Sequence, residues 1–214
     1  MYNTIFFDLD GTLTDPGIGI TNSVAYALSK WNITINDRSE LYKFIGPPLM
    51  DSFATYYGFS NEQCQSALGF YREYFRDRGI FENRVYDGIP ELLSTLKKKG
   101  KRIVLATSKP EEFAVTILKH FDLYRYFDFV SGASMDETRN KKPDVISYAL
   151  ENLGFPVTKE ILMVGDREYD VLGAAQFKID SVGVLYGYGN REELQNAGAT
   201  YIADNVSDIL SYIS

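Results

Sequence analysis

The spacing of apolar positions changes along the chain and divides it into two kinds of segment. A short apolar run at residues 4–7 leads directly into the sequence Asp-Leu-Asp-Gly-Thr. Between Gly17 and Gly79, apolar side chains such as Val24, Ala27 and Leu28 recur at the spacing of a helix face. We therefore expect a short buried strand followed by an almost wholly helical segment.

From Asp87 onward, short apolar runs alternate with helical patterns. The expected strands are 102–107, 127–131, 161–164, 181–185 and 201–203, and the expected helices are 89–99, one after Pro110, one from Pro143, 169–176 and 206–213. This alternation is typical of an α/β fold, a parallel sheet with helices on both faces. The helical segment interrupts it, so we predict a core domain of residues 1–14 and 82–214 and an inserted helical cap domain of residues 15–81.

Polar residues gather where the predicted strands end. These clusters are Asp8 to Thr12, Thr107 to Lys109, Gly165-Asp166 with Asp170, and Lys142 before a helix. Ligands of open parallel sheets bind outside the carboxyl ends of the strands. We therefore expect these distant positions to converge on one site.

Several carboxylates in one site repel each other and require protons or a cation. A site with only a few carboxylate oxygens from the protein suits Mg²⁺. This ion keeps several water ligands and can take an oxygen of the substrate phosphate as a further ligand. Asp8 is a candidate nucleophile for phosphoryl transfer, and Asp10 a candidate general acid and base. The Thr107 hydroxyl, the Ser108 amide and the Lys142 ammonium are candidates to hold the phosphate, with Gly11 allowing close backbone approach.

The amino-acid composition limits the kinds of molecule that the protein is expected to bind. The net charge is -7, with 29 acidic against 22 basic residues, which disfavours binding to nucleic acid. The single cysteine, Cys64, excludes an internal disulfide. We see no signal peptide and no apolar run of the ~20 residues that span a bilayer. We expect a cytoplasmic protein, a monomer or weak dimer, that binds a small phosphorylated metabolite and neither nucleic acid nor membrane.

The motifs together resemble those of the haloacid dehalogenase superfamily of phosphohydrolases. Asp8 to Asp15 (DLDGTLTD) is similar to its first motif, Thr107 to the second, Lys142 before Pro143 to the third, and Gly165 to Asp170 to the fourth. The resemblance covers nearly the whole chain and implies a Rossmann-like core with a mobile cap. It implies an aspartyl-phosphate on Asp8, and Mg²⁺ held by Asp8, the Asp10 carbonyl and Asp166, with Asp170 as ligand or neighbour.

The same resemblance bears on substrate choice. Phe44 to Pro48 looks like the cap loop of the phosphoglycolate phosphatase and 5'-nucleotidase branch, and Phe44 is our candidate for substrate contact. The position after Asp166 is often a small residue in this branch, whereas this sequence has Arg167 there. Lys141 adjoins Lys142, and Lys142 is chosen because it directly precedes Pro143. The sequence does not rank phosphoglycolate, nucleotides or sugar phosphates.

Other functions remain open at this point. A phosphosugar mutase would also phosphorylate Asp8 but return the group to sugar, whereas a carbon–halogen hydrolase would not need Asp10. A phospho-acceptor signalling module also groups carboxylates, a hydroxyl and a lysine around Mg²⁺, but is shorter and has no long insertion after its first strand. A non-catalytic binding protein is a further alternative, although every catalytic position is filled.

Overall fold

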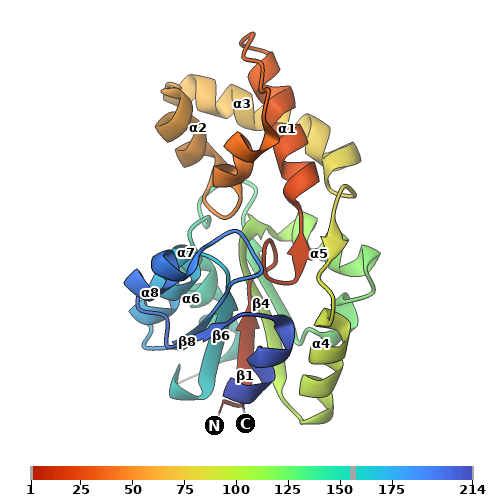
Figure 1. Cartoon of the computed structure of the whole chain (residues 1–214), viewed down its shortest axis with the longest axis vertical. Helices are drawn as coiled ribbons and strands as arrows, with labels where there is room; N and C mark the ends of the chain where they lie inside the picture. Colours follow the sequence, from red (N-terminus) through yellow and green to blue (C-terminus); the bar gives the residue numbers. More distant parts are fainter. Residues whose placement is uncertain (1, 155–157, 214) are drawn as a thin grey trace. The chain divides into compact units, whose positions relative to one another are not determined.

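A parallel sheet forms the centre of the larger part of the molecule. The computed structural model describes residues 2–154 and 158–213, and within them six strands are ordered β5-β4-β1-β6-β7-β8 (Figure 1). Their bounds are Thr4–Phe7 (β1), Arg102–Pro110 (β4), Phe129–Ala133 (β5), Ile161–Gly165 (β6), Asp180–Val184 (β7) and Tyr201–Ala203 (β8). Every neighbouring pair is parallel. The predicted α/β fold class is confirmed.

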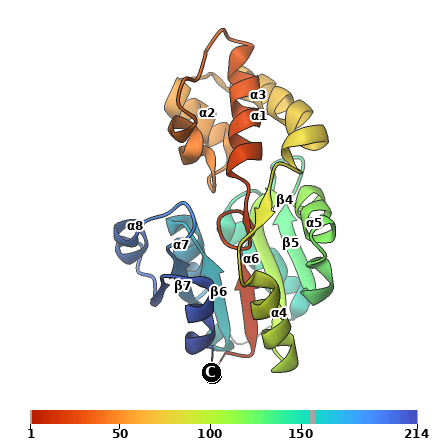
Figure 2. The same cartoon turned by 45° about the vertical axis from the view of Figure 1, so that its right-hand side comes forward.

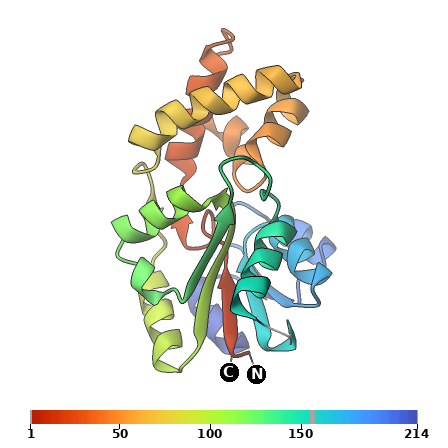
Figure 3. The same ribbon diagram turned by 180° about the vertical axis from the view of Figure 1, so that it is seen from behind.

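Helices cover both faces of this sheet. The core helices are α4 (Ile89–Lys98), α5 (Glu111–His120), α6 (Lys142–Leu153), α7 (Glu168–Gln176) and α8 (Arg191–Asn196), with short η helices Tyr124–Tyr126 (η3), Thr158–Glu160 (η4) and Val206–Tyr212 (η5). Phe6, Val104 and Met163 pack against α6 and α7 on one face. Helices α4 and α5 lie on the other face, as Figures 2 and 3 show from two sides.

The register of the central strands aligns their carboxyl ends. Phe7 of β1 lies opposite Leu105 of β4 and Val164 of β6. The Asp8 amide continues the ladder by donating to the Val164 carbonyl at 2.9 Å. The polar residues that come after these aligned positions therefore emerge at one edge of the sheet.

The segment Pro16–Arg84 forms a second compact unit. It contains the helices α1 (Gly17–Ser29), α2 (Leu49–Tyr57) and α3 (Asn61–Tyr74), the 3₁₀ helix η1 (Arg38–Phe44) and a π-helical turn, η2 (Phe75–Gly79). Its apolar positions are buried, including Val24, Leu28 and Phe53. Two-residue strands, β2 (Thr14–Asp15) and β3 (Arg84–Val85), lie where the chain leaves and re-enters the larger unit. The helical character expected between Gly17 and Gly79 is observed.

Several elements differ from the sequence-based expectation, among them β5, the last helix and α8. Strand β5 starts at Phe129 instead of residue 127, because the Phe127 amide donates to the Tyr124 carbonyl at 3.1 Å and so completes the turn η3. The last helix is a 3₁₀ helix ending at Tyr212. Helix α8 is additional; Asn190 caps it by accepting from the Glu193 amide at 2.9 Å.

Within residues 2–154 and 158–213, every helix is too short or too polar to traverse a lipid bilayer.

Candidate active site

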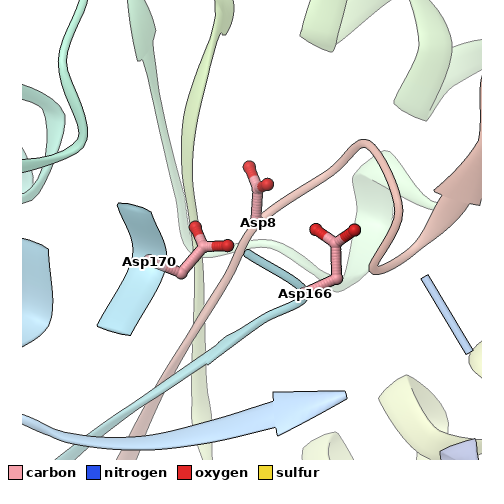
Figure 4. Close-up of side chains that lie close together, drawn as sticks. All are labelled: Asp8, Asp166 and Asp170. Carbon is pink, nitrogen blue, oxygen red and sulfur yellow. The ribbon is translucent and has the colours of Figure 1, made fainter. Parts of the chain in front are cut away.

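Three carboxylates converge beyond the aligned strand ends (Figure 4). Asp8 follows β1, Asp166 follows β6, and Asp170 lies in the first turn of α7. One oxygen of each lies within 4.8 Å of the others, and all three residues are buried. The convergence expected from the parallel topology is therefore observed for these residues.

Burial makes this cluster electrostatically unfavourable without a cation. Loss of solvation raises the pKa of Asp166 well above its usual range, and the charges of Asp170 and Asp8 raise it further. Burial likewise raises the pKa of Asp170 to about 6, although the Lys142 ammonium opposes the shift. The cluster thus favours either bound protons or a positive charge.

Lys142 supplies one such charge. Its ammonium lies 2.8 Å from Asp8 Oδ1 and 2.6 Å from Asp170 Oδ1, and donates to the Ala106 carbonyl at 3.0 Å. Burial disfavours the charged amine, but Asp170 and Asp8 outweigh this effect and raise the pKa of Lys142. The neighbouring Lys141 is exposed. The sequence favours Lys142 over Lys141, and the geometry brings the Lys142 ammonium to the carboxylates.

The donor set fits a divalent cation. Asp166 Oδ2 accepts from the Tyr188 amide at 2.7 Å. Its other oxygen, Oδ1, is buried and has no hydrogen-bond partner among the residues that the structure describes. Carboxylate oxygens are the ligands of hard cations such as Mg²⁺, and a buried carboxylate oxygen requires a partner. Asp8 and Asp166, with Asp170 beside them, could hold such an ion.

Strand β4 brings a second group of polar side chains to the same edge. Its pairing with β5 shifts in register between Ala106 and Pro110, and Thr107, Ser108 and Lys109 lie in this irregular stretch. Thr107 is buried, and its Oγ1 accepts from the Lys109 amide at 3.3 Å. Ser108 is half-buried. A strand irregularity of this kind re-aims side chains next to a site.

Asp10 faces the irregular stretch of β4. Its Oδ2 lies 2.6 Å from Lys109 Nζ, and both side chains are almost buried. Burial raises the pKa of Asp10, and the Lys109 ammonium counteracts the shift. The second oxygen, Asp10 Oδ1, is buried without a hydrogen-bond partner in the described part of the chain.

Gly11 permits the first loop to pass close to Asp166. Its φ is +82°, and an added Cβ would lie 2.1 Å from Asp166 Oδ2. A side chain at this position would therefore be strained and would displace a carboxylate of the cluster. The close backbone approach expected at Gly11 is thus seen in the structure against the Asp166 carboxylate.

Phe44 and Arg167 have partners within their own units. Phe44 is only 1% exposed, and its ring centroid lies 5.1 Å from that of Phe53. Its ring therefore belongs to the core of the unit Pro16–Arg84, and substrate contact by Phe44 stays a prediction. Arg167 Nε lies 2.8 Å from Glu193 Oε1 in α8, so its charge is directed to that helix.

Two groups of the site were not predicted as such. Lys109 was noticed only as a neighbour of Thr107, and its position in the Thr-Ser-Lys sequence was the available signal. The Tyr188 amide carries no side-chain signal at all. The glycines on either side of it, Gly187 and Gly189, were the only hint of a close backbone approach.

This fold and site define an α/β protein with a buried centre of three carboxylates that could hold a cation. The comparison with protein families identifies it further: residues 5–184 match the model of the haloacid dehalogenase-like hydrolases. The chain belongs to this family. The resemblance inferred from the motifs is confirmed.

Individual relatives agree with this assignment. The chain is 45% identical over 204 residues to a 5'-nucleotidase of Pseudomonas aeruginosa, covering 95% of this chain and 92% of the relative. It is 37% identical to the tyrosine-protein kinase PtkA of Mycobacterium tuberculosis, over 92% of this chain and 67% of that protein. The crystal structure of a predicted phosphatase from Clostridium acetobutylicum matches with a TM-score of 0.97 and 51% identity, covering 100% of this chain and 98% of that one. The expected enzyme class, a phosphatase, is confirmed.

Proposed function

We propose that this phosphatase is magnesium-dependent and hydrolyses a small-molecule phosphate monoester through an aspartyl-phosphate on Asp8. One observation carries the proposal: the buried Asp8 carboxylate lies 2.8 Å from Lys142 and within 4.8 Å of the carboxylates of Asp166 and Asp170. The Asp8 carboxylate thus lies beside the positive charge of Lys142, at the edge of the sheet where the strand ends meet. A nucleophile that accepts a phosphoryl group in line requires such a position, because nearby positive charge neutralises the phosphate oxygens.

In the first step, an Asp8 oxygen attacks phosphorus and the bond from phosphorus to the leaving oxygen breaks. Asp10, as an acid, gives its proton to that oxygen, so an alcohol leaves. Lys142, Thr107 and the Ser108 amide hold the phosphoryl oxygens. The buried positions of Thr107 and Lys142 support these roles, since charge stabilisation is strongest where water is excluded.

In the second step, water attacks the aspartyl-phosphate. Asp10, now a carboxylate, removes a proton from the water, and the bond between phosphorus and the Asp8 oxygen breaks. Inorganic phosphate leaves, Asp8 is regenerated, and Asp10 is protonated again. General acid–base catalysis of this kind typically contributes about 10²–10⁴-fold in rate.

We assign the magnesium site to Asp8, Asp166 and the backbone carbonyl of Asp10, with Asp170 as ligand or neighbour. When bound, Mg²⁺ neutralises charge on the phosphoryl oxygens and relieves repulsion within the cluster. The buried Oδ1 of Asp166, without a hydrogen-bond partner among the described residues, supports this assignment. The donor set favours Mg²⁺ over softer metals because it consists of oxygen atoms.

The substrate belongs to the nucleoside 5'-monophosphate or phosphoglycolate type. The 5'-nucleotidase relative supports the first of these. We propose that residues 15–81 act as the cap that selects the substrate, with the loop from Phe44 to Pro48 contributing, and that residues 1–14 and 82–214 perform the chemistry. We place the protein in the cytoplasm, as a monomer or weak dimer.

The test is turnover of p-nitrophenyl phosphate with Mg²⁺, together with trapping of the intermediate. Asp8→Asn should lower kcat by more than about 10³-fold while the protein stays folded, because the nucleophile is lost. Acid quenching during turnover should leave a phosphoryl group on the peptide that contains Asp8. Asp204→Asn, at an exposed carboxylate paired with Arg191, is the matched control.

An active, folded Asp8→Asn variant, or a labelled peptide from elsewhere in the chain, would refute the proposal. Release of free phosphate from a sugar phosphate, without an isomerised product, separates hydrolysis from the mutase alternative.

A further inference from the structure

Lys109 belongs to the site but has no role in the reaction described above. Its side chain is only 5% exposed, and its ammonium lies 2.6 Å from Asp10 Oδ2. Burying a lysine with a carboxylate removes both from water, and the pair contributes little net stability compared with apolar packing. Stability alone therefore does not account for a lysine at this position.

The backbone of the irregular stretch in β4 explains how Lys109 reaches Asp10. Between Ala106 and Pro110 the strand loses its regular register with β5. The Lys109 amide donates to Thr107 Oγ1 at 3.3 Å, so the lysine and the proposed phosphate-binding hydroxyl belong to one local structure. The register shift in β4 therefore positions both the Thr107 hydroxyl and the Lys109 ammonium.

The two oxygens of Asp10 have different surroundings. Lys109 holds Oδ2, whereas Oδ1 is buried and has no hydrogen-bond partner in the described part of the chain. A carboxylate fixed through one oxygen presents the other in a single direction. That direction matters, because a displacement of about 1 Å at a reacting group can lower the rate about 10²-fold.

We propose that Lys109 is a positioning residue for Asp10: it fixes Oδ2 so that Oδ1 exchanges the proton with the leaving oxygen and then with water. The inference rests on the proposed function. It concerns the orientation of Asp10, and Lys109 itself neither touches the phosphate nor transfers the proton.

A positioning role for Lys109 and a merely structural role predict different effects of the leaving group on the rate lost in a Lys109 variant. A nitrophenolate leaves readily without a proton, whereas the more basic methylphenolate needs one. Loss of positioning should therefore slow substrates with basic leaving groups most, whereas a general structural defect should slow all of them alike. Aryl phosphates of similar shape separate these two outcomes.

The experiment measures kcat/KM with Mg²⁺ for 4-nitrophenyl, 4-chlorophenyl, phenyl and 4-methylphenyl phosphate. For Lys109→Met, which retains the length of the side chain without its charge, the loss should grow along this series and exceed about tenfold between its ends, as expected when acid catalysis is impaired. Lys101→Met is the matched control, since Lys101 donates to the Tyr2 carbonyl at 2.6 Å in the same unit. It should leave the dependence on the leaving group unchanged.

A double variant keeps the test valid if Lys109→Met folds poorly. In the double variant Asp10→Asn with Lys109→Met, neither partner is charged. Its kcat/KM values for the four aryl phosphates should equal those of Asp10→Asn alone. An equal loss on all four substrates in Lys109→Met, or a further loss in the double variant, would overturn the proposal. Failure of the proposed function is distinct, because the wild-type protein would then hydrolyse none of the four.

Discussion

At the scale of single residues, the Lys142 ammonium lies between two carboxylates that it does not fully neutralise. It is 2.8 Å from Asp8 Oδ1 and 2.6 Å from Asp170 Oδ1, with only 3% of its side chain exposed. A buried ion pair stabilises little overall, but removing one partner leaves the other charges uncompensated. We therefore expect the folded state to depend on Lys142, in addition to the role in phosphate binding proposed for it above.

Lys142→Met should lower the free energy of unfolding by roughly 3–5 kcal/mol in chelator, because Asp8 and Asp170 lose their counter-charge. Urea denaturation followed by circular dichroism measures this change. Lys141→Met is the control, since Lys141 is the adjacent residue and is exposed. Its effect should stay within about 0.5 kcal/mol. Equal effects of the two substitutions would contradict the assigned position of Lys142.

The raised pKa values of Asp166 and Asp170 predict how stability depends on pH. Burial raises the pKa of Asp170 to about 6 in the folded protein without metal. A carboxyl group whose folded pKa is raised contributes stability below its unfolded pKa of about 4, and this contribution is lost as pH rises through the folded pKa. In chelator the protein should therefore lose stability between about pH 4 and pH 6 from this group.

Magnesium should reverse this trend, because the proposed site would bind it through ionised carboxylates. The melting temperature with Mg²⁺, minus that with chelator, should increase from pH 4.5 to pH 7. Asp170→Asn should reduce the pH dependence in chelator. A difference that is the same at every pH would show that these carboxylates do not link metal and proton binding.

At the scale of elements, the loop from Tyr186 to Asn190 contacts the Asp166 carboxylate, the proposed metal ligand. The Tyr188 amide donates to Asp166 Oδ2 at 2.7 Å, and the Tyr186 hydroxyl donates to the Thr12 carbonyl at 2.9 Å. The Tyr188 hydroxyl donates to Asp15. The loop between β7 and α8 thereby fixes both Asp166 and the loop that follows β1.

Gly187→Ala should weaken metal binding through this loop. An added Cβ would lie 2.3 Å from the Gly11 carbonyl oxygen and 2.4 Å from Asp166 Cβ, so the loop or Asp166 must move. Changes in groups that orient a metal ligand typically lower affinity about 10–100-fold. Titration with Mn²⁺ followed by electron paramagnetic resonance measures this loss.

Gly69→Ala is the control for this substitution, since a Cβ added there would meet no heavy atom within 4 Å beyond its chain neighbours and the backbone of its own helix. Its Mn²⁺ affinity should equal that of the wild type. An unchanged affinity in Gly187→Ala would mean that the loop does not determine the position of Asp166.

At the scale of the whole molecule, the chain divides into parts that we expect to perform different tasks. Pro16–Arg84 is a compact helical unit with its own buried apolar side chains, including Phe44 and Phe53. The carboxylates, Lys142 and the irregular stretch of β4 all belong to the other unit. Chemistry and substrate selection should therefore be separable by exchanging one unit.

A chimera tests this division. Residues 16–84 would be replaced by the corresponding segment of the Pseudomonas aeruginosa 5'-nucleotidase. The ratio of kcat/KM values between two substrates, such as a nucleoside 5'-monophosphate and phosphoglycolate, should move by about tenfold or more, equivalent to ~1.4 kcal/mol of differential transition-state binding. Inhibition by chelator and inactivation by Asp8→Asn should persist. Preferences that stay unchanged in a folded chimera would assign selection to the core unit.

Much of the architecture follows from local pattern. The alternation of apolar runs and helical spacing after Asp87 predicted the parallel sheet, because strands buried on both faces must be continuously apolar. The placement of Asp8, Thr107 and Asp166 directly after such runs predicted their convergence. Boundaries were less well predicted: the start of β5 depends on the hydrogen bond from Phe127 to Tyr124, which no apolar pattern reveals.

The sequence by itself determined which carboxylates gather at the strand ends and that Lys142 accompanies them, since strand ends and residue types are local properties. Only the tertiary structure decided which partners they have: Lys109 with Asp10, the Tyr188 amide with Asp166, and Phe44 within a hydrophobic core. The physical reason is that side-chain direction depends on register shifts and loops from distant parts of the chain. A strand irregularity between Ala106 and Pro110, or a backbone amide 22 residues beyond its acceptor, becomes visible only when the elements are packed together.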